Sequence, residues 1–390
     1  MKIRAVVLGT LAACALWFVF SASFPADVLL DAEGNLAAKG DLEVCKEATW
    51  EEAMGQDPKL DSLFEYLRTK KGFSGAVLVA QDGFIKHAGA YGFADNRKKV
   101  PLTMESEFQL ASVSKMFTAT SVLLLYQDGL IGLDDALCEY FPKFPYEDIT
   151  IRHLLNHRTG LVRYMALGDQ LWDRDKMMDC QDVVDLYAQE QPDLWFTPGR
   201  RFNYSNANYA LLAALVEKVS GTQFETFIQS RIFNKLGMDQ SYCVDHKARL
   251  KRDHHTIGYR ATRRGYRAAG GDYLDGVMGD KGMHSTIFDL FKFDLALRNE
   301  TLLAPSIMEE AYAPGSPERK RSNYGFGWRM RTERPDMVYH FGWWRGYRTC
   351  FMRDLSKNRT LIVLSNRDNL RHTVNFFNLY DQIFSTPLPV

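Results

Sequence analysis

The sequence has no excess of either charge. Its 390 residues include 48 Lys and Arg and 48 Asp and Glu, so the formal net charge is zero. Proteins that bind nucleic acid by neutralising phosphates need a basic surplus, so nucleic acid is not an expected partner. The sequence also contains no internal repeat and no low-complexity segment. The chain is long enough to bury one large core or two smaller ones, and 46% of its residues are apolar, as in an ordinary globular protein.

Cysteines are few and scattered. The chain has six and no C-x-x-C pair, so it lacks the spacing of a zinc cluster or of a thioredoxin-type redox site. Cys14 lies in the N-terminal segment, which leaves an odd number in the body of the chain. An oxidising compartment would permit one disulfide, and the sequence does not select its partners among Cys45, Cys138, Cys180, Cys243 and Cys350.

The N-terminus has the pattern of an export signal. Lys2 and Arg4 precede an uncharged apolar run over residues 5–20, and small residues follow at 21–23. A basic start, an apolar segment and small residues indicate a signal that is not part of the fold. We therefore expect an exported protein, located in the periplasm or the cell envelope, with residues 1–24 as an export signal or membrane anchor.

Three fates of this segment stay open. Cleavage after Ser23 would release a soluble protein. The sequence Leu-Ala-Ala-Cys at residues 11–14 is similar to a lipobox, which would acylate Cys14. The apolar run up to Phe24 could instead remain as a single anchor, because about 20 apolar residues span a bilayer. Attachment to a membrane through this segment is therefore one of the alternatives.

The body of the chain predicts strands at both ends and helices between them. Residues 25–59 are weakly periodic and form an expected N-terminal extension before a single domain over residues 60–390. Apolar runs around Asp82-Gly83 predict a β-hairpin, and residues 349–365 predict a second one. Helix-length segments fill residues 112–235. We expect an α/β (α+β) fold, in which an antiparallel sheet formed by both chain termini and flanked by helices carries an inserted, mainly helical lobe.

The sequence Ser112-Val-Ser-Lys115 is the first candidate for chemistry. A helix pattern follows it, so Lys115 is expected over the same helix face as Ser112. A serine hydroxyl becomes a good nucleophile when a nearby group takes its proton, and a partly desolvated amine at a helix N-terminus can do so. The S-x-x-K pattern alone is weak, because a serine near a helix cap and a surface lysine produce it equally.

Two further elements follow later in the chain. Tyr204 and Asn206 lie after a Pro-Gly turn, where a tyrosine could shuttle a proton if a cation lowers its pKa and an asparagine could donate to a substrate carbonyl. His340, Gly342 and Trp343 precede the last strands, where glycine would let a substrate lie along a strand edge. Taken singly, a tyrosine buried at a loop and a glycine-rich strand start explain them as well.

In this order, the motifs Ser-x-x-Lys, Tyr-x-Asn and His-x-Gly resemble those of the serine β-lactamase and penicillin-binding superfamily. The Tyr-x-Asn form is similar to the class C-like branch of that superfamily. The resemblance extends from about residue 60 to residue 385, with further family landmarks at residues 149–161, 235–238, 282–289 and 324–328. It implies the fold of the superfamily and a hydrolase that works through an acyl-serine intermediate.

The resemblance also implies a role for each motif residue. Ser112 would be the nucleophile, and Lys115 and Tyr204 would move its proton, with the primary base left open between them. Asn206 would hold the substrate amide, and the backbone N–H groups of Ser112 and Trp343 would form the oxyanion hole. The expected partner is a small-molecule or peptide substrate, and no metal or organic cofactor is implied.

The third motif departs from the β-lactamases of this branch, which carry Lys-Thr-Gly where this sequence has His340-Phe-Gly342. The threonine hydroxyl is missing, and the charge of a histidine depends on pH. A histidine at this position is more similar to the family's D-alanyl peptidases and esterases. Arg345 or Arg348 could still receive a substrate carboxylate. We therefore expect a hydrolase of a D-amino-acid or cell-wall-type peptide or of a small ester. The alternatives are a true β-lactamase and a non-catalytic penicillin-binding-type sensor.

One other pattern has the spacing of a metal site. His153 and His157 are four residues apart, as in a helical zinc pair, but Leu154 stands where the H-E-x-x-H motif has its glutamate. We therefore do not expect a metal at these histidines.

Overall fold

The computed structural model describes residues 28–30, 36–38, 55–243, 250–319 and 321–385. The chain divides into two units, residues 1–47 and 48–390. In the first unit, β1 (Val28–Leu30) and β2 (Leu36–Ala38) form an antiparallel pair. The expected leader, including Cys14, lies outside the described residues. Within those residues, no helix combines the length and the apolar character needed to cross a bilayer.

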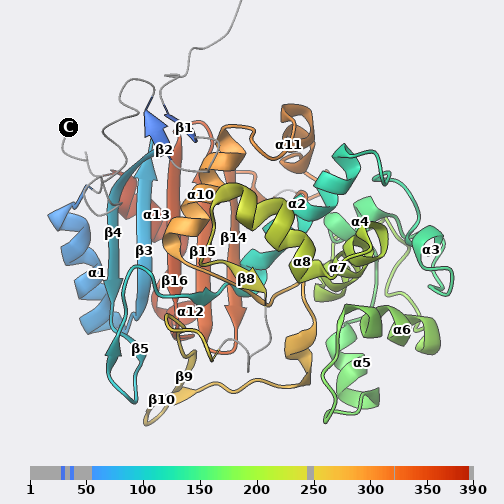
Figure 1. The fold of residues 1–390 in the computed structure, drawn as a ribbon, viewed down its shortest axis with the longest axis horizontal. Coiled ribbons are helices and arrows are strands. Elements are labelled where there is room, and N and C mark those ends of the chain that lie inside the picture. Colours follow the sequence, from blue (N-terminus) through green and yellow to red (C-terminus); the bar gives the residue numbers. More distant parts are fainter. Residues whose placement is uncertain (1–27, 31–35, 39–54, 244–249, 320, 386–390) are drawn as a thin grey trace, which may run out of the picture. The chain divides into compact units, whose positions relative to one another are not determined.

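A seven-stranded antiparallel sheet forms the framework of the second unit (Figure 1). Strands from the start and from the end of the unit pair directly, with Gly75 opposite Ser365 and Gln81 opposite Arg359. This arrangement confirms the sheet that was predicted from both chain termini. The strands are, in spatial order, β12 (Ser322–Tyr324), β13 (Arg329–Arg331), β14 (Arg334–Trp344), β15 (Tyr347–Asp354), β16 (Arg359–Ser365), β3 (Gly75–Gln81) and β4 (Phe84–Tyr91).

Both predicted hairpins are confirmed. β3 and β4 are joined by Asp82 and Gly83, whose φ angles of 55° and 82° are those of a type I′ turn. This turn matches the right-handed twist of the flanking strands, which is why Asp-Gly is a strong hairpin signal. β15 and β16 are joined by a longer turn, in which the Asp354 carboxylate accepts hydrogen bonds from Ser356 and from the Lys357 backbone.

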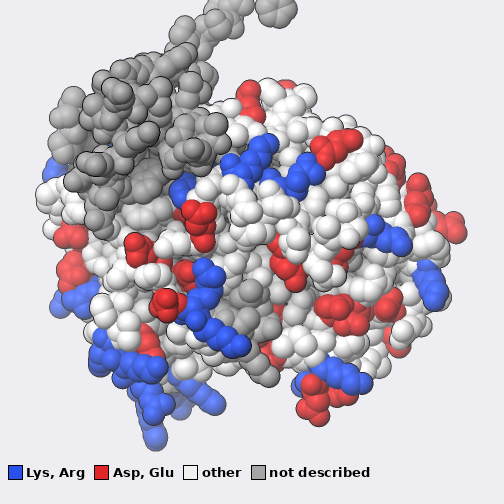
Figure 2. Space-filling model, in the orientation of Figure 1, with Lys and Arg blue, Asp and Glu red and all other residues white. Residues whose placement is uncertain are grey.

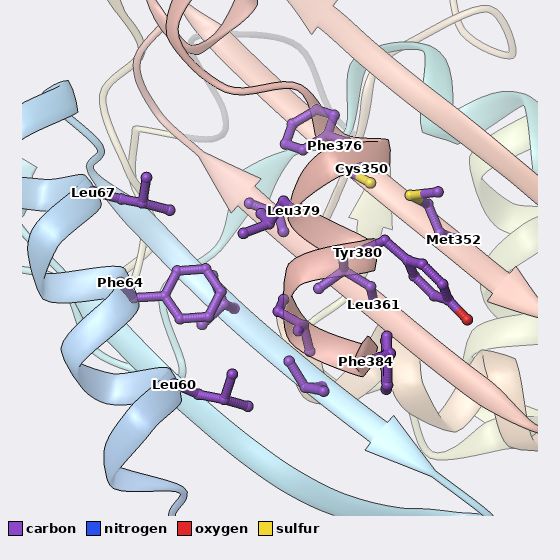
Figure 3. Close-up of a cluster of buried hydrophobic side chains, with 14 of the residues drawn as sticks. Leu60, Phe64, Leu67, Cys350, Met352, Leu361, Phe376, Leu379, Tyr380 and Phe384 are labelled. Atoms are coloured by element: carbon purple, nitrogen blue, oxygen red, sulfur yellow. The ribbon is translucent and has the colours of Figure 1, made fainter. Parts of the chain in front are cut away.

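Helices from the two ends of the unit cover one face of the sheet (Figure 3). They are α1 (Pro58–Lys71), α12 (Leu370–Thr373) and α13 (Phe376–Ser385). The Asp57 side chain caps α1 and Gly72, with φ of 71°, ends it. Leu60, Phe64 and Leu67 recur at helical spacing and pack against the strands, so local caps and periodicity together fix where this helix begins, ends and faces.

The other face of the sheet is covered by α10 (Ile287–Arg298), which packs on β3 and β16. A fully buried ion pair joins these layers, because Arg353 on β15 donates to the carboxylate of Asp294 on α10 at 2.5 Å. The same carboxylate accepts hydrogen bonds from Arg298 and Thr360. A buried charge is tolerated only when it is paired and hydrogen-bonded in this way.

The predicted helical lobe is inserted between the two groups of strands (Figure 1). Its central helices pack on each other, and the side chains from Ser114 to Leu125 are all buried, which explains the apolar character of that segment on every side. The lobe contains α2 (Ser114–Gln127), α3 (Leu137–Tyr140), α4 (Ile151–Leu155), α5 (Tyr164–Leu171), α6 (Cys180–Glu190), α7 (Asn206–Ser220), α8 (Phe224–Ile228), the π-turn η2 (Gln229–Phe233) and η3 (Asn234–Leu236).

Shorter elements make up the rest of the second unit. They are β5 (Phe93–Asp95), β6 (Val100–Pro101), β7 (Phe108–Gln109), η1 (Ala111–Val113), β8 (Tyr242–Cys243), β9 (Tyr259–Thr262), β10 (Gly265–Ala268), η4 (Tyr273–Gly276), β11 (Met283–Ser285) and α11 (Pro305–Ala311). Figure 2 shows acidic and basic side chains interspersed over the visible face, with basic ones gathered towards the β9–β10 hairpin. Zero net charge therefore does not mean an even distribution of charge.

Candidate active site

Ser112 lies in the tight turn η1, directly before α2. The preceding residue, Ala111, has a φ of 52°, a left-handed conformation that is uncommon for a residue with a side chain. Two hydrogen bonds hold the turn: the Thr349 hydroxyl donates to the Leu110 carbonyl at 2.7 Å, and the Leu110 N–H donates to the Met283 carbonyl at 2.8 Å. The turn is therefore fixed by strand β15 on one side and by β11 on the other.

Lys115 lies in the first turn of α2, and its side chain is fully buried. Its ammonium group donates to Ser112 Oγ at 3.2 Å and to the Asp280 backbone carbonyl at 2.6 Å. The helix spacing expected from the sequence therefore brings the two side chains into contact. A lysine held by two acceptors in this way orients the serine hydroxyl instead of lying on the surface.

Tyr204 lies just before α7, and the segment that carries it is held by His157. The His157 carbonyl accepts from the Asn203 N–H at 2.9 Å, and His157 Nδ1 accepts from the Ser205 N–H at 3.3 Å and from Asn208 at 3.1 Å. The His157 ring also lies against the Tyr204 ring, with centroids 4.3 Å apart. His157 therefore positions the Tyr-x-Asn motif from a distant part of the sequence.

Positive charge surrounds the Tyr204 ring. Lys115 Nζ is 5.2 Å and the Arg329 guanidinium carbon 4.4 Å from the ring centroid. The hydroxyl oxygen is buried without a hydrogen bond of normal geometry to the described residues, yet Ser112 and Lys115 are near enough to act on it. Burial raises the pKa of Tyr204, but Lys115 and Arg329, and then hydrogen bonding with Ser112 and Lys115, outweigh it and bring this pKa below its ordinary value.

His340 is not among the residues that line the pocket containing Ser112 and Tyr204. It is fully buried, its Nδ1–H donates to the Phe341 carbonyl at 3.0 Å, and its Nε2 accepts from the Tyr324 hydroxyl at 3.0 Å. Burial, followed by the charges of Arg329 and Lys115, holds the pKa of His340 well below its ordinary value, so the ring is neutral at neutral pH. The sequence predicted that His340 contacts the substrate and carries a pH-dependent charge. Its burial contradicts both predictions.

Ser112, Tyr204 and Asn206 line the same pocket, which has a volume of about 400 Å³. It is lined by Ser112, Tyr204, Asn206, Arg329, Tyr339, Phe341, Trp343 and Arg348. Asn206 is the first residue of α7, and its side-chain oxygen is buried without a hydrogen-bond partner among the described residues. Trp343 stands at the rim and is 53% exposed. The pocket therefore joins Ser112 to a polar amide and an aromatic side chain.

Gly342 contributes through its lack of a side chain. A Cβ at this position would lie 2.0 Å from Thr349 Oγ1 and 2.3 Å from the Leu110 carbonyl oxygen, far inside van der Waals contact. The glycine lets β14 approach the Ser112 turn. Of the two arginines considered for a substrate carboxylate, Arg345 forms an ion pair with Asp272, while Arg348 lines the pocket.

The histidines with zinc-like spacing do not share a helix. α4 ends at Leu155, and His157 lies beyond it with a φ of 61°. His153 instead takes part in the cap at the start of α4, where its backbone N–H donates to Thr150 Oγ1 at 3.2 Å. In the part of the chain that the structure describes, no three His, Cys, Asp or Glu side chains form a metal-binding group.

The family model described as Beta-lactamase matches residues 60–379 of this sequence. The chain belongs to the β-lactamase family. Penicillin-binding protein 4* of Bacillus subtilis (strain 168) is 37% identical over 322 residues, which cover 79% of this chain and 71% of the relative. A D-aminopeptidase of Brucella anthropi is 31% identical over 71% of this chain and 53% of the relative.

Solved structures agree on the fold of this β-lactamase family member. A penicillin-binding protein from Bacillus halodurans has a TM-score of 0.71 at 22% identity, with 82% of this chain and 98% of that chain covered. A D-amino acid amidase from Ochrobactrum anthropi SV3 has a TM-score of 0.67 at 23% identity, with 84% and 98% covered. The resemblance inferred from the motifs is thus confirmed, as is the fold class.

The buried ion pair between Asp280 and Lys281 lies beside the site and was not predicted from any sequence motif. The Lys281 ammonium donates to the Asp280 carboxylate at 3.1 Å and to the Tyr164 hydroxyl at 2.9 Å, and Tyr164 donates to the other Asp280 oxygen at 3.2 Å. Because the Asp280 carbonyl accepts from Lys115, this network fixes one of the two acceptors of that lysine. In this β-lactamase-family chain, it is a structural support of the site.

The described cysteines do not take part in this chemistry. Cys138, Cys180, Cys243 and Cys350 are all free, so within the described residues the disulfide that an oxidising compartment would permit does not form. Burial raises the pKa of the Cys180, Cys243 and Cys350 thiols, which keeps them protonated and unreactive.

Proposed function

We propose that this β-lactamase-family protein is an exported serine hydrolase that forms an acyl-enzyme on Ser112. Its substrate is the amide or ester bond of a D-amino-acid or cell-wall-type peptide, or of a small ester. The observation that carries the proposal is the convergence of the Ser112 hydroxyl, the Lys115 ammonium at 3.2 Å and Tyr204 in one pocket. The relatedness to a D-aminopeptidase and to a penicillin-binding protein supports the substrate class.

Tyr204 is the proposed primary base. Lys115 acts as a hydrogen-bond donor towards both Ser112 and Asp280, which leaves the role of proton acceptor to another group. The lowered pKa of Tyr204 favours its phenolate form, although burial alone would oppose it, and a phenolate beside Ser112 can take the hydroxyl proton. Lys115 then orients the serine and stabilises the negative charge of its neighbours.

The reaction follows in two halves. Ser112 Oγ bonds to the substrate carbonyl carbon as its proton passes to Tyr204, the C–N or C–O bond breaks, and the leaving group takes that proton. A water molecule then attacks the acyl carbon with the same proton relay, and Ser112 is regenerated. The backbone N–H groups of Ser112 and Trp343 are the proposed donors to the oxyanion, and one such donor is typically worth about 10²–10³ in rate.

The test is turnover of a panel that contains a D-Ala-D-Ala peptide, a D-amino acid amide, a p-nitrophenyl ester and a penicillin. Ser112→Ala should abolish turnover of every substrate that the native protein hydrolyses. Ser121→Ala is the matched control, because Ser121 is buried in the same helix and donates only to the Phe117 carbonyl. Its turnover should equal that of the native protein.

Other outcomes select the alternatives. Preferential hydrolysis of the penicillin would identify a true β-lactamase. Tight binding of a peptide or penicillin without turnover, unchanged in Ser112→Ala, would identify a sensor and refute the enzyme. Export is tested separately by fractionating cells that express the full chain and determining the N-terminus of the mature protein, where cytoplasmic retention of an intact N-terminus would refute it.

A further inference from the structure

The third motif of this chain leaves the pocket without a charge from β14. His340 is neutral, is not part of the lining, and is hydrogen-bonded to Tyr324. A tyrosine that accepts a proton in a buried site nevertheless needs nearby positive charge, because burial disfavours the phenolate. A residue besides Lys115 must therefore supply positive charge near Tyr204.

Arg329 on β13 places a second positive charge next to Tyr204. Its guanidinium carbon lies 4.4 Å from the centroid of the Tyr204 ring and 5.7 Å from that of Tyr324. Arg329 lines the same pocket as Ser112, and no Asp or Glu of the described residues forms an ion pair with it. An arginine keeps its charge at every pH at which proteins are folded, so this charge is permanent.

Arg331 does not share the surroundings of Arg329, although alternation alone would place both on one face, because the register of β13 against β14 shifts between Met330 and Arg331. Arg331, two residues further along β13, forms an ion pair with Glu333 at 3.1 Å and lies 4.4 Å above the Phe377 ring. It is therefore neutralised and in contact with α13, while Arg329 faces the tyrosines. The two arginines form a natural pair for comparison, with the same side chain on the same strand.

Besides Arg329, the titratable groups around Tyr204 come from six parts of the fold. Ser112 and Lys115 approach from η1 and α2, Tyr209 from α7, Tyr324 from β12, and the two buried histidines from the loop after α4 and from β14. Burial holds the pKa of each histidine, His157 and His340, well below its ordinary value, so both are neutral. Positive charge on the ring therefore comes from Lys115 and Arg329.

We propose that Arg329 is the positioning residue that holds Tyr204 in its proton-accepting form, in place of the cation that the third motif lacks. The inference deepens the proposed function and rests on it for the use that is made of Tyr204. Arg329 acts through Tyr204 and not on the bond that is broken. A charge on the neighbouring strand thereby replaces one that the His-x-Gly sequence cannot provide.

The first experiment does not depend on any substrate. The ionisation of Tyr204 is measured as the difference in ultraviolet phenolate absorbance between each protein and the same protein carrying Tyr204→Phe, across a pH series. In Arg329→Gln the midpoint should rise by about one pH unit or more, the size expected when an opposite charge within 4–6 Å is lost. Arg329→Lys should stay near the native midpoint, and so should Arg331→Gln.

The second experiment reads the reaction. The rate of covalent labelling of Ser112 by a fluorophosphonate is followed over the same pH series, and its acidic limb should shift upward in Arg329→Gln as far as the tyrosine midpoint does. Arg329→Lys should restore the native limb. A lower rate with an unshifted limb would mean that Arg329 only shapes the pocket and would overturn the proposal.

The two measurements separate the two proposals. An unchanged Tyr204 midpoint in Arg329→Gln overturns the role of Arg329, whatever the labelling shows. A raised midpoint in a protein whose Ser112 never reacts supports the electrostatic role of Arg329 and refutes the hydrolase. Thermal unfolding of Arg329→Gln and Arg331→Gln, measured in parallel, identifies any shift that arises from partial unfolding.

Discussion

Replacing Gly342 by alanine should disable the site while the fold survives. The new Cβ would lie 2.3 Å from the Leu110 carbonyl oxygen, whereas ordinary contact begins at 3.4 Å, so strand β14 and the Ser112 turn must separate by about 1 Å. A misplacement of that size at a catalytic group costs about 10²-fold in rate. Overpacking of this kind typically costs about 1–3 kcal/mol in the free energy of unfolding.

The assay compares the rate of fluorophosphonate labelling at Ser112 with the free energy of unfolding in urea. Gly270→Ala is the matched control, because a Cβ there meets no atom within 4 Å, and it should change neither quantity. If Gly342→Ala reacts within about threefold of the native rate, the approach of β14 does not position Ser112 and the steric argument is refuted. A general loss of structure would appear as a large fall in the free energy of unfolding.

Further predictions concern the buried charges. Arg353→Met should lower the free energy of unfolding by about 3 kcal/mol, measured with urea, because it leaves Asp294 buried with one partner fewer; an unchanged value contradicts this. Burial raises the pKa of Asp294, but Arg353 and Arg298 outweigh it, so the folded pKa lies below the unfolded value of about 3.9. The stability that ionised Asp294 contributes is therefore complete above the unfolded pKa and is lost as pH falls through the folded pKa. Urea unfolding at a series of acidic pH values should show this loss in the native protein and not in Asp294→Asn. Lys281→Met should lower the free energy of unfolding, because it leaves the Asp280 carboxylate buried without its cation, and it should slow Ser112 labelling about tenfold or more through the contact of Asp280 with Lys115. Adding Asp280→Asn should recover stability, because the double variant no longer buries an unpaired carboxylate. If stability does not recover, loss of the ion pair is not the cause of the destabilisation.

Much of the fold follows from local signals that residues carry wherever they are placed. The Asp82-Gly83 turn needs two left-handed residues, and this requirement is visible in the sequence itself. The contact between Ser112 and Lys115 was likewise predictable, because a helix places residues three apart on one face. Such features require no knowledge of the partner segments.

The remainder of the site depends on which face of a strand meets which helix. His340 was expected in contact with substrate, but the pairing of β14 turns it towards Tyr324 and burial makes it neutral. Arg329 carried no motif, and its place over Tyr204 follows only from the register of β13 against β14. His157 appeared as half of a zinc-like pair, whereas the chain places its ring against Tyr204.

Acylation of Ser112 is the step on which the proposed reaction depends. The most direct test is to quench the protein with acid during its reaction with a penicillin or a p-nitrophenyl ester, and to map the modified peptide by mass spectrometry. We predict a mass increase equal to the acyl group on the peptide that contains Ser112, and no increase in Ser112→Ala. An adduct on a different residue, or turnover that persists in Ser112→Ala, would contradict the role of Ser112 as the nucleophile.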